Sequence, residues 1–317
     1  MSESNIILVR LTTSRIGVER QLKGEDVDGA MGRSIDKNVV KVTKRLLDCK
    51  EYDACLTVAN KARSTLTKMS VPAKWVGNGF AMMKAERYDA LCDELRKIRV
   101  ELDLAAEKLA AVYPERMAEA QVELARNGIP WDPSEYPMQD EVRAGFSIEW
   151  SPMSFDVPVA LARVSESAFQ EAKEDAARRF ESVLADAELV MLTEAKKLVE
   201  AMLERVRPGP DGEKKVFRDS LVVNMREWLS EAPFRNLSNS TELDAIVRQM
   251  RDALGNIEPD ELRASGTLRS IVSMGMNEVA AVLDTCLAKA PSRKIIVMKP
   301  APANGAGESL PAVGVQP

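Results

Sequence analysis

Residues 87–127 read RYDALCDELRKIRVELDLAAEKLAAVYPERMAEAQVELARN, and the fold depends on this stretch. Its apolar side chains recur at alternating spacings of three and four residues, a pattern typical of a helix that lies along another helix. At ~1.5 Å per residue, about 40 residues predict a rod of roughly 60 Å, with a bend near Pro114. The residues of this seam are Tyr88, Leu91, Leu95, Ile98, Leu102, Ala105, Leu109 and Val112.

A second rod is predicted over residues 164–206, and a connector over residues 128–163 separates it from the first. The simplest assembly of two rods of similar length is an antiparallel, coiled-coil-like helical hairpin. A parallel homodimer of each rod is the alternative, so the sequence leaves homo-oligomerisation open. The second stripe consists of Phe169, Ala172, Ala176, Phe180, Leu184, Ala187, Met191, Ala195, Leu198 and Met202.

The remaining segments predict a mainly α protein with a small β patch. Short apolar or alternating runs near residues 6–12, 146–150 and 294–298 predict strands. Residues 35–69 read as helical, residues 72–80 as a turn, and residues 208–212 (PGPDG) as a break. Shorter helices are expected over residues 214–231, 241–254 and 267–290.

We therefore divide the chain into four parts. Residues 1–83 form an N-terminal strand and a basic helical head, and residues 84–207 form the hairpin. Residues 213–299 form a C-terminal helical region. Residues 300–317 are rich in proline and glycine, which predicts a disordered tail.

The composition excludes several kinds of chemistry. The chain has no histidine, which removes His-based triads, His-ligated zinc and the Glu-x-x-His di-iron bundle. The four cysteines are scattered, and no P-loop or nucleophile elbow is present. We therefore expect a protein without enzymatic activity, cofactor or metal.

A basic stretch near the N-terminus predicts a second type of function. The net charge is −5, yet residues 1–80 contain 14 Lys and Arg against 9 Asp and Glu. On the predicted helix Lys37, Lys41, Lys44 and Arg45 share one side. This side is either a solvated face or a stripe that contacts the phosphates of nucleic acid.

The sequence also predicts a location. It contains no apolar run of 18 residues, and its first residues are polar and acidic, so neither a membrane span nor a signal peptide is expected. The expected compartment is the cytoplasm of a bacterium or of a phage-infected cell.

The order of elements resembles a bacterial, plasmid and phage family described only as a domain of unknown function. Residues 15–22 are followed by the acid pair Glu25 and Asp26, and a long helix follows Val71 and Pro72. An alternating strand at residues 146–150 and a helical region after residues 234–237 complete the likeness. Members of this family are often encoded beside MoxR-type AAA+ ATPases and von Willebrand factor A proteins. The resemblance implies an accessory protein that works with an ATPase.

Three functions remain open on the sequence. The leading hypothesis is a non-enzymatic helical interaction protein of a phage or mobile element, with a protein partner such as an AAA+ ATPase. The first alternative is a nucleic-acid-binding protein that uses Lys37, Lys41, Lys44 and Arg45, with help from Lys61, Arg63 and Lys68. The second alternative is a structural component of a virion.

Overall fold

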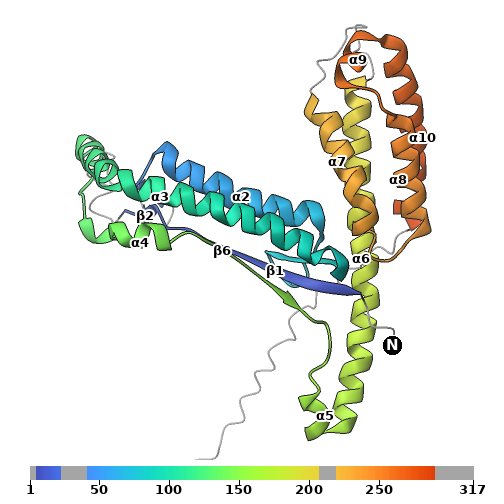
Figure 1. Ribbon diagram of the computed structural model, residues 1–317, viewed down its shortest axis with the longest axis horizontal. Helices are drawn as coiled ribbons and strands as arrows, with labels where there is room; N and C mark the ends of the chain where they lie inside the picture. Colours follow the sequence, from blue (N-terminus) through green and yellow to red (C-terminus); the bar gives the residue numbers. More distant parts are fainter. Residues whose placement is uncertain (1–4, 23–40, 207–218, 290–317) are drawn as a thin grey trace, which may run out of the picture.

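The computed structural model describes residues 5–22, 41–206 and 219–289. It confirms a mainly α fold with a small antiparallel sheet. The strand expected near residues 294–298 and the tail over residues 300–317 lie outside the described residues. Helices on one side of the sheet form an arm that extends sideways from a bundle of helices (Figure 1).

The sheet has four strands in the order β4-β5-β1-β6, all antiparallel. The first predicted strand and the mid-chain strand are confirmed, and they pair with each other, with Leu11 opposite Trp150. A two-stranded ribbon of β2 and β3 lies apart from this sheet. The strands are β1 (Ile6–Ser14), β2 (Glu19–Gln21), β3 (Thr43–Arg45), β4 (Val71–Pro72), β5 (Phe80–Lys84) and β6 (Ser147–Met153).

The arm is built on two antiparallel helices, α2 (Lys50–Met69) and α3 (Tyr88–Arg126). Glu51 near the start of α2 faces Arg116 late in α3, whereas Lys61 faces Glu101 at 2.7 Å. The expected seam of α3 is buried from Leu91 to Leu102. Beyond it Ala106 and Tyr113 are buried in place of Ala105 and Val112, although Leu109 is buried as expected. A straight helix drifts against a seven-residue repeat, which accounts for this shift.

The bundle consists of helices that alternate in direction, which is the arrangement of an up-and-down bundle (Figure 1). Methionines from four helices, Met191, Met225, Met250 and Met276, are fully buried in its core. The short helix α9, which the sequence did not predict, joins the last two long helices. The helices are α6 (Glu166–Val206), α7 (Asp219–Arg235), α8 (Thr241–Leu254), α9 (Pro259–Ala264) and α10 (Gly266–Lys289).

The predicted hairpin between the two rods is wrong. Both rods exist as long helices, but α3 packs on α2 in the arm, whereas α6 packs on α7, α8 and α10 in the bundle. The two helices accordingly contribute to separate hydrophobic cores. The periodicity located the apolar side of each rod correctly but contained no information about which helix would cover it.

The sheet forms a wall between the two cores. Because side chains alternate across a strand, Val9 and Leu11 of β1 point into the arm, whereas Leu8 points into the bundle. The same alternation in β5 sends Met83 into the arm and Met82 into the bundle. Each core therefore rests on one face of the same sheet.

The first part of α6 extends beyond the bundle, and we call it, together with α5 (Ala160–Val164), the stalk. Within the described chain the buried residues of α6 begin only at Val183, so residues 166–182 have none. Aromatic rings hold the base of the stalk, because Phe155 stacks on Trp75 and meets Phe180 in a T-shaped contact.

Two other expectations are corrected. Residues 43–45 form strand β3 rather than helix, and α2 begins only at Lys50. Residues 72–80 are not only a turn, because Phe80 begins β5, a strand buried on both faces that lacks an alternating pattern. The connector also contains the short helix α4 (Gln139–Ala144) and the 3-10 turn η2 (Pro133–Glu135), and η1 (Ala85–Arg87) precedes α3.

Two prolines lie inside helices, and neither interrupts its helix. Pro114 lies in α3 and Pro233 in α7, and each removes the amide that would bond the carbonyl four residues earlier.

α10 differs from the other helices in its hydropathy. It is long and apolar enough to cross a membrane by length and composition, a weak indication because core helices meet the same criterion.

Candidate functional site at the junction of arm and bundle

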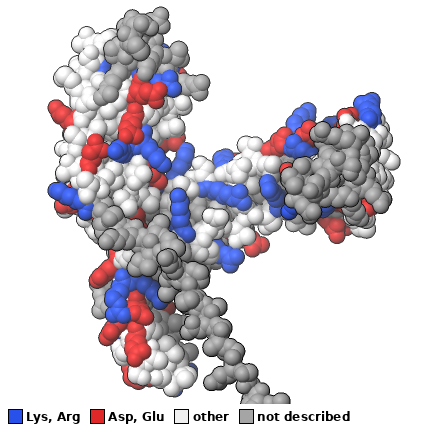
Figure 2. All heavy atoms as spheres, turned by 180° about the vertical axis from the view of Figure 1, so that it is seen from behind, with Lys and Arg blue, Asp and Glu red and all other residues white. Residues whose placement is uncertain are grey.

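The arm and the bundle meet along two adjoining clefts of about 1010 and 1020 Å³. The first, the inner cleft, lies between α2, α6 and α7. The second, the basic cleft, lies between β1, β5, the turn before β5, α2 and α6, and is lined by Arg10, Arg63, Lys74 and Lys197. Figure 2 shows Lys and Arg side chains gathered along the arm and where it leaves the bundle.

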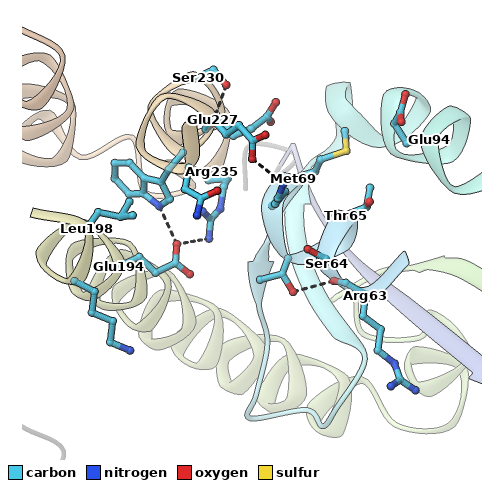
Figure 3. A pocket seen from close by; sticks show the side chains of 16 residues that line it. Arg63, Ser64, Thr65, Met69, Glu94, Glu194, Leu198, Glu227, Ser230 and Arg235 are labelled. Carbon is cyan, nitrogen blue, oxygen red and sulfur yellow. Dashed lines mark hydrogen bonds and ion pairs between the residues drawn. The ribbon is translucent and has the colours of Figure 1, made fainter. Parts of the chain in front are cut away.

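A buried guanidinium closes one side of the inner cleft. Arg235 of α7 is 3% exposed, and its Nη2 lies 2.7 Å from Oε2 of Glu194 on α6. Its Nε donates to the carbonyl of Ser70 at 2.9 Å, and Trp228 Nε1 donates to the same Glu194 oxygen at 2.9 Å. Figure 3 shows this contact between Glu194 and Arg235. The bonds of Arg235 thus connect α7 to α6 and to the end of α2.

Two ion pairs connect the arm to the bundle here. Lys68 Nζ lies 2.7 Å from Glu227 Oε2, and Arg87 Nη2 lies 2.8 Å from Glu231 Oε2. Such partly exposed pairs stabilise the fold by only about 0–1 kcal/mol each. Their importance here is electrostatic balance, because they compensate the carboxylates around the inner cleft.

The basic cleft is shaped by the turn between β4 and β5. Gly79 has a φ of +82°, and its carbonyl accepts a hydrogen bond from the amide of Leu11 at 2.7 Å. A Cβ at position 79 would lie 2.4 Å from the Leu11 carbonyl oxygen. Glycine therefore lets the turn approach β1 closely, and it places Lys74 and Asn78 at the rim of the cleft.

The residues predicted to bind nucleic acid do not form one helical stripe. Lys37 lies outside the described residues, and Lys41 is exposed in a segment without regular structure. Lys44 is 6% exposed on β3, with its Nζ 2.6 Å from Glu135 Oε2. Arg45 pairs with Asp48 at 2.8 Å and also contacts Asp53. Their role in binding nucleic acid stays a prediction, but it cannot rest on a shared helical face.

Metal binding and thiol reactivity depend on how the described carboxylates and cysteines are placed. Among them no group of three or more Cys, Asp or Glu side chains is placed to hold a metal ion. Cys55 is fully buried, and desolvation raises its pKa to about 11. Burial also raises the pKa of Cys49. A thiol that remains protonated at neutral pH is a poor nucleophile.

Sequence reasoning missed most of the junction. Arg10, Lys74 and Lys197 come from a strand, a turn and a helix, and Arg235 comes from a fourth element. No local spacing links them, because only the packing of arm against bundle brings them together. The glycines at 77 and 79 were a usable local signal for a tight approach of the backbone.

Comparisons with known proteins add no information about this site. The chain matches no protein-family model, and neither a curated protein nor a solved structure is significantly similar to it.

Proposed function

We propose that the chain is a non-enzymatic interaction protein whose stalk binds a protein partner. The observation that supports this proposal is the apolar stripe of the second rod. Phe169, Ala172 and Ala176 lie on one side of the stalk and remain half-exposed. The whole stripe was expected to be buried, but in the described chain its burial begins only beyond the stalk, with Ala187 and Met191.

An uncovered helix of this kind gains stability from a partner. Seventeen residues span roughly 25 Å, and an isolated helix of that length is only marginally stable in water. Two further apolar side chains are strongly exposed here, Val159 at 70% just before α5 and Val164 at 85% at its end. Alanines in the stripe allow a partner helix to approach closely.

The partner is expected to be a different protein. The resemblance to a family encoded beside MoxR-type ATPases makes an AAA+ ATPase the first class to test. A second copy of the chain and the coat of a virion are the competing occupants. Light scattering on the purified chain distinguishes a homodimer, and purified particles reveal incorporation into a virion.

Co-purification from the natural host cells tests the proposal. We expect a stoichiometric partner with the wild-type chain and its loss when Phe169→Glu and Ala176→Glu are combined. The control combines Ser167→Glu and Ser182→Glu, which are exposed positions of the same helix with the same change in charge. Recovery of no stoichiometric partner, or equal recovery with the stripe variant, would contradict a partner-binding stalk.

A further inference from the structure

The basic cleft carries positive charge that the described chain does not neutralise. Arg10, Arg63, Lys74 and Lys197 are all exposed and line the cleft. None of them forms an ion pair with a carboxylate of the described residues. Arg63 donates only to the neutral hydroxyl of Thr13.

The carboxylate that lines the basic cleft is already paired with another cation. Within the described chain Glu194 is the one carboxylate that lines the basic cleft, and it is held by Arg235 at 2.7 Å. Four cations thus lie together without compensation, although the chain as a whole has a net charge of −5. Such a local concentration of positive charge in a recess attracts anions far more strongly than the net charge suggests.

Neutral donors and a planar stacking surface lie between these cations. Hydroxyl and amide groups commonly join Arg and Lys in binding phosphate oxygens. The guanidinium of Arg10 lies over the ring of Phe80, 5.7 Å from its centroid, and guanidinium planes and aromatic rings are surfaces on which unpaired bases stack. The neutral donors that line the cleft are Thr12, Thr13 and Asn78. The hydroxyls of Thr67 and Thr193 also line it, but they donate to backbone carbonyls of their own helices.

We propose that the basic cleft binds a single strand of nucleic acid, with its phosphates on Arg10, Arg63, Lys74 and Lys197. A volume of about 1020 Å³ suits an extended ligand rather than one small anion. The cations come from a strand, a turn and two helices, which matches a ligand that carries its charges along its length. A single strand of nucleic acid is favoured over a duplex because the cations line a cleft between the arm and the bundle.

This surface shares Arg63 with the residues that the sequence suggested but otherwise differs from them. Lys44 and Arg45 are engaged by carboxylates elsewhere in the arm. The free cations lie instead at the junction, where the arm and the bundle both contribute.

Fluorescence anisotropy with a short labelled oligothymidylate tests the proposal. With four phosphates neutralised on a single strand, log K is expected to fall with log salt with a slope of about −3. Combining Arg10→Glu, Lys74→Glu and Lys197→Glu should weaken binding by about 100-fold at low salt. The matched control combines Lys108→Glu, Lys173→Glu and Arg248→Glu, exposed positions that line neither cleft and change the net charge equally.

The outcomes separate the proposal from its rivals. A loss confined to the cleft variant supports it, and circular dichroism shows that both variants remain folded. Equal loss in the two variants means attraction by overall charge and overturns it. Absence of binding at low salt overturns it, as does binding of tripolyphosphate alone without binding of the strand. The stalk variants do not touch these residues, so the failure of either proposal is distinguishable from the failure of the other.

Discussion

Each proline inside a helix leaves one carbonyl without its usual donor, and a side chain from a neighbouring helix supplies the missing bond. Pro114 frees the carbonyl of Ala110, which accepts from Gln139 Nε2 at 2.9 Å. Pro233 frees the carbonyl of Leu229, which accepts from Arg251 Nη2 at 3.1 Å. These bonds compensate the lost intrahelical hydrogen bonds.

Replacement of Gln139 by alanine is expected to destabilise the protein by about 1 kcal/mol, the usual contribution of one hydrogen bond. In a Pro114→Ala background the amide at position 114 can bond Ala110 again, so the same replacement should cost almost nothing. Urea unfolding of the four proteins of this double-mutant cycle measures both values. Equal costs in the two backgrounds would show that Gln139 acts for another reason.

The tyrosines report on the arm at high pH. Burial raises the pKa of Tyr113 to about 12, and burial together with the hydrogen bond to Cys92 raises that of Tyr88 to about 12. Burial also raises the pKa of Tyr52 and Tyr136. These are the 4 tyrosines of the chain, and all belong to the core of the arm or pack against it.

Because the folded pKa exceeds the unfolded pKa, folding keeps the phenols protonated. The resulting stability is complete below about pH 10 and declines between pH 10 and about pH 12. Absorbance at the phenolate band should therefore rise at a higher pH in the folded protein than in urea, with Tyr88 and Tyr113 titrating near pH 12, together with loss of helical circular dichroism. In urea it should rise near pH 10. A folded protein that titrates near pH 10 would contradict the burial of these rings.

At the scale of elements, residues 166–182 of the stalk and the rest of α6 are expected to differ in protection from hydrogen exchange, although they belong to one helix. Residues 166–182 have no buried member, whereas Val183, Ala187 and Met191 begin the buried face. Local opening is cheap where few apolar contacts are lost.

Hydrogen exchange of the isolated protein should consequently be fast across residues 166–182 and slow from Met191 to the end of the helix. Mass spectrometry of overlapping peptides measures this difference, and α3 serves as an internal reference, because its buried seam is continuous from Leu91 to Tyr113. Uniform protection along α6 in a monomer would show that the stalk is stable without a partner.

The elements also show what the sequence could predict. Long periodic patterns identified α3 and α6, and alternation identified β6, because burial of one face leaves a repeat in the chain. A short apolar run rich in β-branched residues identified β1. β5 was missed because both of its faces are buried, which removes the alternation. The pairing of rods was wrong because α2, whose buried face includes the small residues Ala59 and Ala62, covers α3 in place of α6. The sequence could not predict the basic cleft as a site, because only tertiary packing brings its cations together.

At the scale of the whole molecule, the sheet makes neighbouring residues serve different cores. Met82 and Met83 are adjacent in β5 and each is 1% exposed, yet one faces the bundle and the other the arm.

Met82→Ala and Met83→Ala should each destabilise the protein by about 2–5 kcal/mol through the cavity that they leave. Hydrogen exchange should rise first in the bundle for Met82→Ala and first in the arm for Met83→Ala. Met138→Ala, at a side chain that is 71% exposed, is the control and should change neither the stability nor the hydrogen exchange of the two parts. If both core variants affect the same peptides, the two cores are not separated by the sheet.

A consequence of this shared wall concerns attempts to divide the chain. A fragment that ends after β6 would keep the strands but expose Leu8, Val71 and Met82 to water. A fragment that begins at α6 would lose the surface on which its own helices rest. Neither half is expected to remain soluble alone, and mixing the two separately produced halves offers a route to a reassembled molecule.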